Sequence, residues 1–226
     1  MNDFKYRPDS FPPIVKNLII INVLVYIAQL TINGLTEKIM LYPVMFPQFE
    51  PYQIATHMFA HAPNSFFHIL FNMFGLWMFG RILENVWGGK RFLLFYLLCG
   101  VGAAACHILV QYFSFEQWQQ AMAAGDELRA ARFEQSLGPV LGASGAVMGI
   151  LAAFAYLFPN TELYIMFIPV PVKAKWAVLG LVGIDLFFGL ASFGNDNIAR
   201  FAHLGGALTG FLIVLFWNRK NRRRFY

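Results

Sequence analysis

Residues 92–112 read FLLFYLLCGVGAAACHILVQY, and this run indicates what class of protein the chain is. Its 21 residues include no Asp, Glu, Lys or Arg, and a helix needs about 20 mostly apolar residues to cross a bilayer. The two cysteines, Cys99 and Cys106, both lie in it. On a helix roughly 10 Å would separate them, which is too far for a disulfide. The run therefore predicts a membrane-spanning helix.

Five more apolar stretches predict spans on either side of it, about residues 14–30, 66–86, 143–158, 176–191 and 201–217. Hydrophobic residues make up 58% of the chain and charged residues 13%, whereas soluble domains have nearly half and a quarter. So little charge excludes a disordered chain and could not coat a water-facing surface. The sequence predicts an all-α membrane protein, a six-helix bundle forming one domain over residues 1–226.

The distribution of basic residues predicts the orientation of this bundle. Six spans put both termini on one side, and that side would hold thirteen Lys and Arg residues: 5, 7, 16, 81, 90, 91, 173, 175, 219, 220, 222, 223 and 224. The other side would hold four: 38, 129, 132 and 200. Basic residues concentrate in cytoplasmic connections, so we expect both termini in the cytoplasm. The basic run at 219–224 fits anionic lipid headgroups, and we expect no nucleic-acid partner.

Two outer connections are long enough to carry structure of their own. Residues 31–65 mix four prolines with aromatic residues, which suits a loop in the membrane interface. Residues 114–137 set apolar side chains among Gln, Glu and Arg, which predicts an insertion of one or two amphipathic surface helices broken at Gly125.

The fourth predicted span begins with a glycine-rich stretch, GPVLGASGAVMG at residues 138–149, which suggests a start inside the membrane. Helix-end amides at that depth are tolerable only where they line a protein-walled cavity. Ser144 would stand at this start, where a hydroxyl nucleophile meets the free amides of a first turn. The alternative is a serine that merely lets two membrane helices pack tightly.

His203 lies in the last predicted span and gives Ser144 a potential partner. Small residues share its helical stripe and form a matching face on the fourth span: Gly206 and Gly210, Gly145 and Gly149. If these faces pack together, His203 approaches Ser144 and its neutral imidazole could take the hydroxyl proton. The alternative is a buried histidine with an ordinary hydrogen bond.

His68 and Asn72 begin the second span with a spacing of four, so both side chains share one face. Both can donate hydrogen bonds, which suits an oxyanion, although a polar clasp between helices would look the same. His57 and His61 have the same spacing and raise a zinc site. Met58 stands where a zinc protease helix has Glu, and no acid follows nearby, so we expect no metal.

Asp185 is the one carboxylate well inside a predicted span. It could orient His203, but a position near the outer end of its helix is an equal alternative. The sequence analysis therefore leaves Asp185 out of the catalytic set.

These residues resemble the motifs of the rhomboid family of intramembrane serine proteases, in order along the spans. The matching positions are His68 and Asn72, Gly142-Ala143-Ser144-Gly145, Ala202-His203 with Gly206 and Gly210, and Glu84-x3-Gly88-x3-Phe92. Two positions differ. Members often have Trp-Arg where this chain has Tyr52-Gln53, and some have an aromatic residue where it has Met148.

The resemblance implies a serine endopeptidase with a Ser–His dyad that requires no acid and no cofactor. Ser144 would be the nucleophile and His203 the base, while the Ser144 amide, His68 and Asn72 would hold the oxyanion. Its partners would be the lipid bilayer and transmembrane protein substrates, cut near the outer face. The compact form suits a bacterial plasma membrane, with an organelle membrane as the alternative. The sequence does not define an oligomeric state.

Two other functions compete with the protease. One is an inactive rhomboid-like protein that binds client membrane segments, but such a protein would be expected to lack the serine or the histidine. The other is a small transporter, but the chain shows no paired repeat with a broken helix in each half. We therefore expect the enzyme.

Overall fold

The computed structural model describes residues 9–164, 170–191 and 197–221, and its regular structure is almost entirely helical. The main helices are α1 (Pro13–Thr31), α4 (Phe66–Gly75), α5 (Arg81–Trp87), α6 (Gly89–Ala123), α8 (Ser144–Leu157), α9 (Ala174–Ala191) and α10 (Asn197–Asn221). Shorter elements are α2 (Leu35–Ile39), α3 (Gln53–Thr56), α7 (Glu127–Glu134), a 3-10 turn at His57–Phe59 and the antiparallel pair β1 (Glu162–Leu163) and β2 (Val172–Lys173). The basic residues expected at 5, 7 and 222–224 lie outside the described residues.

Four helices of the described part are long and apolar enough to cross a membrane: Pro13–Thr31, Phe66–Trp87, Gly89–Ala123 and Arg200–Arg219. The fourth and fifth predicted spans are also helices, and α8 is a shorter apolar one of 14 residues. Every predicted span therefore falls on a helix.

The insertion predicted at 114–137 differs from the structure at its beginning. It does not start as a separate helix, because α6 continues without interruption to Ala123. No Gly or Pro stands between Gly102 and Gly125, so nothing in the backbone stops the helix earlier. The chain does turn at Gly125, whose φ of +70° suits glycine, and α7 follows. The break was predicted correctly.

The second span ends in a turn that ties three helices together. A π-helical turn at Leu76–Gly80 joins α4 to α5, and Gly88, with a φ of +79°, separates α5 from α6. The Glu84 carboxylate accepts hydrogen bonds from the backbone amides of Ile14 and Val15 at 2.9 and 2.8 Å. An anion on these unpaired first-turn amides stabilises the beginning of α1.

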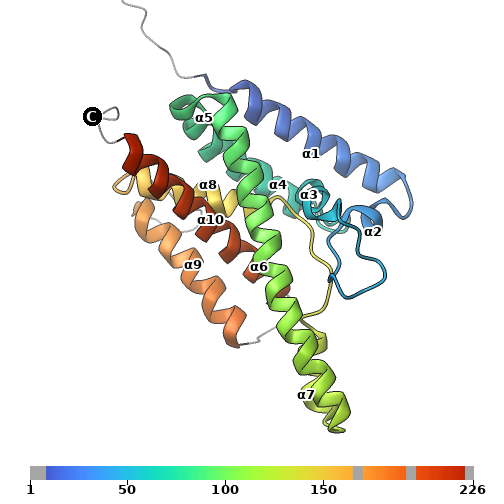
Figure 1. The fold of residues 1–226 in the computed structure, drawn as a ribbon. Coiled ribbons are helices and arrows are strands. Elements are labelled where there is room, and N and C mark those ends of the chain that lie inside the picture. The colour runs from blue at the N-terminus through green and yellow to red at the C-terminus, as the bar shows by residue number, and fades with distance from the viewer. Residues whose placement is uncertain (1–8, 165–169, 192–196, 222–226) are drawn as a thin grey trace, which may run out of the picture.

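Figure 1 shows the arrangement: α6 crosses the middle of the molecule, α1 lies on one side of it, and α9 and α10 lie on the other. Helix α10 contacts α6, α8 and α9. Fully buried side chains fill the space between the helices, among them Leu76, Leu83, Phe92, Phe95, Tyr96 and Ile150. Residues 142–143 and 145–150 are buried, so α8 begins inside the protein rather than at its surface.

Candidate active site

The local backbone sets Ser144 at the first position of α8. Gly142, just before it, has a φ of +131° and donates its amide to the His57 carbonyl at 2.9 Å. A Cβ at this position would lie 2.9 Å from the Nε2 of His68, so both the conformation and the space require glycine. The sharp turn leaves the first-turn amides of α8 without partners in their own helix, beside the serine hydroxyl.

Helices α8 and α10 touch through their backbones, at the four glycines singled out in the sequence. A Cβ on Gly206 would overlap the Gly145 carbonyl, and a Cβ on Gly210 would lie 2.5 Å from the Gly149 carbonyl oxygen. Real Cβ atoms do not approach other atoms this closely. The absence of side chains on Gly206 and Gly210 is therefore what lets α10 lie close to α8, while Gly145 and Gly149 also leave room for Ala103 and Cys99 of α6.

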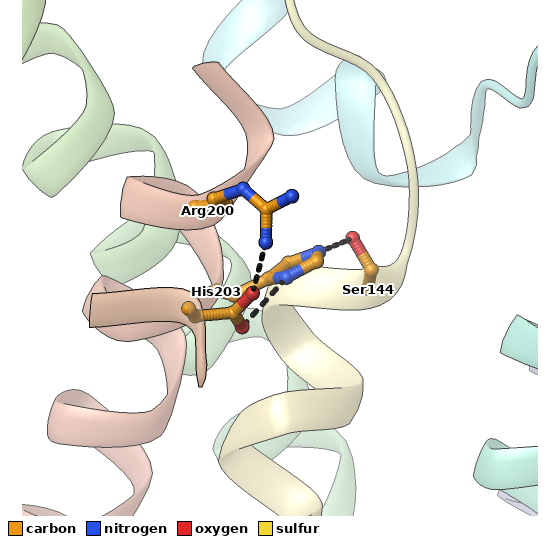
Figure 2. A network of polar contacts seen from close by, with 4 residues as sticks. Ser144, Arg200 and His203 are labelled. Atoms are coloured by element: carbon orange, nitrogen blue, oxygen red, sulfur yellow. Dashed lines mark hydrogen bonds and ion pairs between the residues drawn. The ribbon is translucent and has the colours of Figure 1, made fainter. Parts of the chain in front are cut away.

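Ser144 and His203 meet across this helix contact. The Oγ of Ser144 lies 2.7 Å from the Nε2 of His203, as Figure 2 shows. This distance is within the hydrogen-bond reach required of a nucleophile and its base.

Two charged residues that the sequence analysis left out of the catalytic set extend this network. Asp185, on α9, has its Oδ2 3.0 Å from the Nδ1 of His203, and its Oδ1 3.6 Å from the Nη1 of Arg200. The isolated carboxylate in an apolar run was the signal for Asp185. Nothing in the sequence indicates that Arg200 lies at this site, because a basic residue between two spans usually indicates only on which side of the membrane the connection lies.

His68 faces the same space from α4 with a defined tautomer. Its Nδ1 accepts a hydrogen bond from the Ala62 amide at 3.2 Å, so the ring proton resides on Nε2, near Gly142. His68 can therefore donate toward the start of α8. Asn72 lies one turn further, and its Nδ2 donates to the His68 carbonyl at 2.8 Å. This bond uses one of the two donor hydrogens of the Asn72 side chain within its own helix.

A cavity of about 720 Å³ unites these side chains between α4, α8, α9 and α10. Its polar lining consists of Ser65, His68, Asn72, Ser144, Asp185, Arg200 and His203. Met148, four residues after the serine, lies in its wall beside Val147. The predicted nucleophile, base and oxyanion donors thus line one cavity.

The two loop histidines are buried beside this cavity, and each ring has a contact within the protein. His57 directs its Nδ1 at the Gln53 carbonyl, and the ring of His61 packs on His68 with centroids 5.2 Å apart. Burial lowers the pKa of His57, and burial together with the nearby His68 lowers the pKa of His61 to about 4. In the described part of the chain, no group of three or more His, Cys, Asp or Glu side chains could hold a metal ion.

Gln53 stands where similar proteins often have arginine, and it anchors the first outer loop. Its side chain is buried, accepts a hydrogen bond from the Tyr42 amide, and donates to the carbonyls of Lys38 and Gln48. The hydrogen bonds of the neutral Gln53 side chain therefore hold residues 38–53 of the first outer loop together.

Comparison with known proteins places this geometry in a family context. Residues 48–220 match the Rhomboid domain family. The chain is 32% identical over 153 residues to Rhomboid protein 1, mitochondrial, of Saccharomyces cerevisiae, covering 68% of this chain and 38% of that protein. It is 32% identical over 174 residues to RHOMBOID-like protein 12, mitochondrial, of Arabidopsis thaliana (76% and 47%). It is also 32% identical over 171 residues to the human Presenilin-associated rhomboid-like protein, mitochondrial (73% and 38%). The matched part is less than half the length of each relative.

Proposed function

The chain belongs to the rhomboid family of membrane proteins, and from this premise we propose that it is an intramembrane serine endopeptidase that cleaves transmembrane segments of other proteins. One observation carries the proposal: the Ser144 hydroxyl and the His203 imidazole lie in hydrogen-bond contact in a polar cavity at the start of a buried helix. A serine and histidine so arranged are equipped for acyl transfer.

In the first step the Oγ of Ser144 attacks the carbonyl carbon of the scissile bond, and the Nε2 of His203 takes the hydroxyl proton. The 2.7 Å separation of these atoms supports direct transfer. The resulting imidazolium then protonates the leaving amine, the C–N bond breaks, and an acyl-Ser144 ester remains. A water molecule deprotonated by His203 hydrolyses this ester and restores the enzyme.

The negative charge that develops on the substrate oxygen requires donors that are already in place. The amide of Ser144 and the Nε2–H of His68 are two candidates. Ser144 is the first residue of α8, and the Nε2 of His68, on α4, lies next to Gly142 just before this helix. Asn72 is the third, through the donor capacity left beside its bond to the His68 carbonyl. Each preorganised donor of this kind contributes about 10²–10³-fold to kcat in serine proteases.

The substrate must enter this cavity unwound. A bond within an intact helix is shielded, since its carbonyl accepts a hydrogen bond from the amide four residues on, and opening it in hydrocarbon costs several kcal/mol for each unpaired group. Polar cavity walls reduce that cost. We therefore expect substrates with Gly, Pro or polar residues just beyond the cleavage point. The residue before it should be small, because the backbone of Gly142–Gly145 leaves little room.

For the whole chain we propose one membrane domain over residues 1–226 with six spans, both termini in the cytoplasm, and cleavage near the outer face. Four candidate spans and two further apolar helices support the count. The bacterial plasma membrane expected from the sequence stays a prediction. The relatives compared above carry mitochondrial names and lend it no support.

A serine-directed fluorophosphonate tests the proposal without knowledge of the natural substrate. The folded protein in mild detergent should be labelled at Ser144, and Ser144→Ala and His203→Ala should each abolish labelling and cleavage of a transmembrane reporter. The two losses should not add, because the pair acts as a unit. Ser136→Ala, outside the cavity, is the matched control and should label normally. An unlabelled and inactive wild-type protein would refute the protease and favour a client-binding rhomboid-like protein.

A further inference from the structure

We propose that Asp185 is a positioning residue that orients the imidazole of His203 for Ser144, so that in this chain a carboxylate supports the pair of serine and histidine. The inference rests on the proposed function and deepens it. It starts from a contact that neither the sequence motifs nor the family resemblance implies: a carboxylate on α9 faces the side of the His203 ring opposite Ser144.

The distances define which ring nitrogen of His203 carries the proton. Its Nδ1 lies 3.0 Å from the Oδ2 of Asp185, and its Nε2 lies 2.7 Å from the Oγ of Ser144. An ionised carboxylate can only accept hydrogen bonds, so Nδ1 must be the donor and carry the ring proton. The Nε2 lone pair is then free to accept the proton of Ser144, which is the tautomer that a general base requires.

Arg200 forms an ion pair with the second oxygen of Asp185. The Nη1 of Arg200 lies 3.6 Å from Oδ1, and its guanidinium stacks over the ring of Phe188, with the Cζ 5.0 Å from the ring centroid. Arg200 and His203 are three residues apart on α10, so both point toward α9 from the same face. Figure 2 shows Ser144, His203 and Arg200 close together, with dashed lines marking the contacts of this network. Each carboxylate oxygen therefore has its own partner.

The location of Asp185 argues for a function beyond solubility. An ionisable group in an apolar span is costly, and such groups usually mark functional sites. The residues beside it on α9, Ile184 and Leu186, are about half exposed, whereas the side chain of Asp185 is only 14% exposed. The carboxylate thus points into the protein, where its charge would stabilise the imidazolium that forms when Ser144 gives up its proton.

The competing explanation is that Asp185 has a purely structural role, because its contacts with His203 and Arg200 would also hold α9 against α10. The two roles differ in what a substitution changes. A clasp affects stability and substrate binding, while a positioning residue affects kcat at unchanged KM. Asp185→Asn is the sharpest variant, since its amide can donate to Nδ1 and so favour the wrong tautomer, an exchange that lowered kcat about 10⁴-fold in a serine protease with a triad.

The experiment compares wild type with Asp185→Asn, Asp185→Ala and Asp185→Glu in liposomes containing a transmembrane reporter, together with the thermal midpoint of each. Asp185→Asn and Asp185→Ala should lose at least about 100-fold in kcat with KM within about twofold, and Asp185→Glu should recover part of the loss. Lys175→Gln removes a charge ten residues, or about 15 Å, before Asp185 on the same helix and should leave kcat unchanged. Values for Asp185→Asn within about threefold of wild type, or a rise in KM with kcat unchanged, would overturn the inference.

A second measurement separates this inference from the proposed function. Spectra of ¹⁵N-histidine-labelled protein report the tautomer of His203 directly, with the signal assigned by its loss in His203→Ala. Nδ1 should be protonated in wild type, and Asp185→Ala should give a mixture of tautomers. An Nε2-protonated ring in wild type would overturn the role of Asp185 even in an active protease. The predicted spectra in a protein that cuts nothing would refute the protease and leave the positioning intact.

Discussion

The glycine contact between α8 and α10 gives a quantitative test of how tightly the site is built. Gly206→Ala adds one methyl group that would overlap the Gly145 carbonyl, where both partners are backbone and neither can rotate away. Even the looser Gly210 position would put a methyl carbon 2.5 Å from an oxygen. Ordinary contacts begin about 3.4 Å apart, so α10 must move outward by an ångström or so.

That displacement acts directly on the hydrogen bond between Ser144 and His203, because His203 lies one turn before Gly206 on the same helix. The 2.7 Å separation between Ser144 and His203 would grow beyond useful reach. Misplacement by about 1 Å costs on the order of 100-fold in rate, and we expect this loss for Gly206→Ala in both phosphonate labelling and reporter cleavage. Gly206→Val should lose more.

Gly180→Ala is the matched control, because Gly180 is also a helical glycine and a Cβ there meets no atom within 4 Å. It should keep full activity and be slightly more stable, since alanine favours helix over glycine. Thermal unfolding in detergent must accompany each rate. A Gly206→Ala protein that labels as fast as wild type would show that this glycine contact does not set the position of His203, and an equal loss in Gly180→Ala would show that the assay reports general damage.

Three more predictions concern acid stability, the oxyanion and the substrate. Burial keeps His61 neutral in the folded protein, with its pKa lowered from 6.5 to about 4, so the unfolded chain binds more protons below pH 6.5. The free energy of unfolding should therefore be highest above about pH 6.5 and decrease toward pH 4, with His61 accounting for on the order of 3 kcal/mol of the decrease. Between these pH values the thermal midpoint of His61→Gln should decrease less than that of wild type. His68→Ala should lower kcat about 10²–10³-fold with little change in KM, and Asn72→Ala should cost less because its amide is partly committed to the His68 carbonyl. An unbroken poly-Leu segment in liposomes should resist cleavage, while an Ala-rich version with a Gly or Pro should be cut near the outer face; mass spectrometry of the products would show central cleavage of poly-Leu if this account of unwinding is wrong.

The helices could be predicted from the sequence because hydrophobic runs of membrane length have few alternatives. Their ends were harder where composition changes without a breaking residue. Helix α6 continues through Phe113 to Ala123 although its side chains turn amphipathic, since backbone hydrogen bonding propagates until a residue such as Gly125 interrupts it. Hydropathy reports where apolar surface ends, which is a different property from where a helix ends.

The contact of Ser144 with His203 could be anticipated because a row of glycines along a helix predicts which of its faces packs closely against a neighbour. Gly206 and Gly145 mark these faces on α10 and α8. Asp185 and Arg200 have no such flanking pattern. Gly180 and Gly183 on α9 face open space, whereas a Cβ on Gly189, one turn after Asp185, would lie 3.3 Å from the ring of Phe201 on α10. A single glycine contact does not form a stripe from which the direction of Asp185 could be predicted. Only the packing of α9 against α10 determines that the carboxylate points inward.

The charges of this network explain how proton transfer could proceed at membrane depth. Asp185 and Arg200 form an ion pair, and the mechanism proposed above starts from a neutral His203, so in this scheme the site buries little net charge before reaction. Attack by Ser144 creates a cation on the imidazole and an anion on the substrate oxygen, a separation that would be severely penalised in hydrocarbon. The cation forms beside the Asp185 carboxylate and the anion beside the Nε2–H of His68, so each new charge meets a partner of opposite sign that is already oriented. A dyad would leave the imidazolium to the water of the cavity. By this reasoning, the loss from Asp185→Asn should grow when that water is restricted, and it should be larger in liposomes than in detergent.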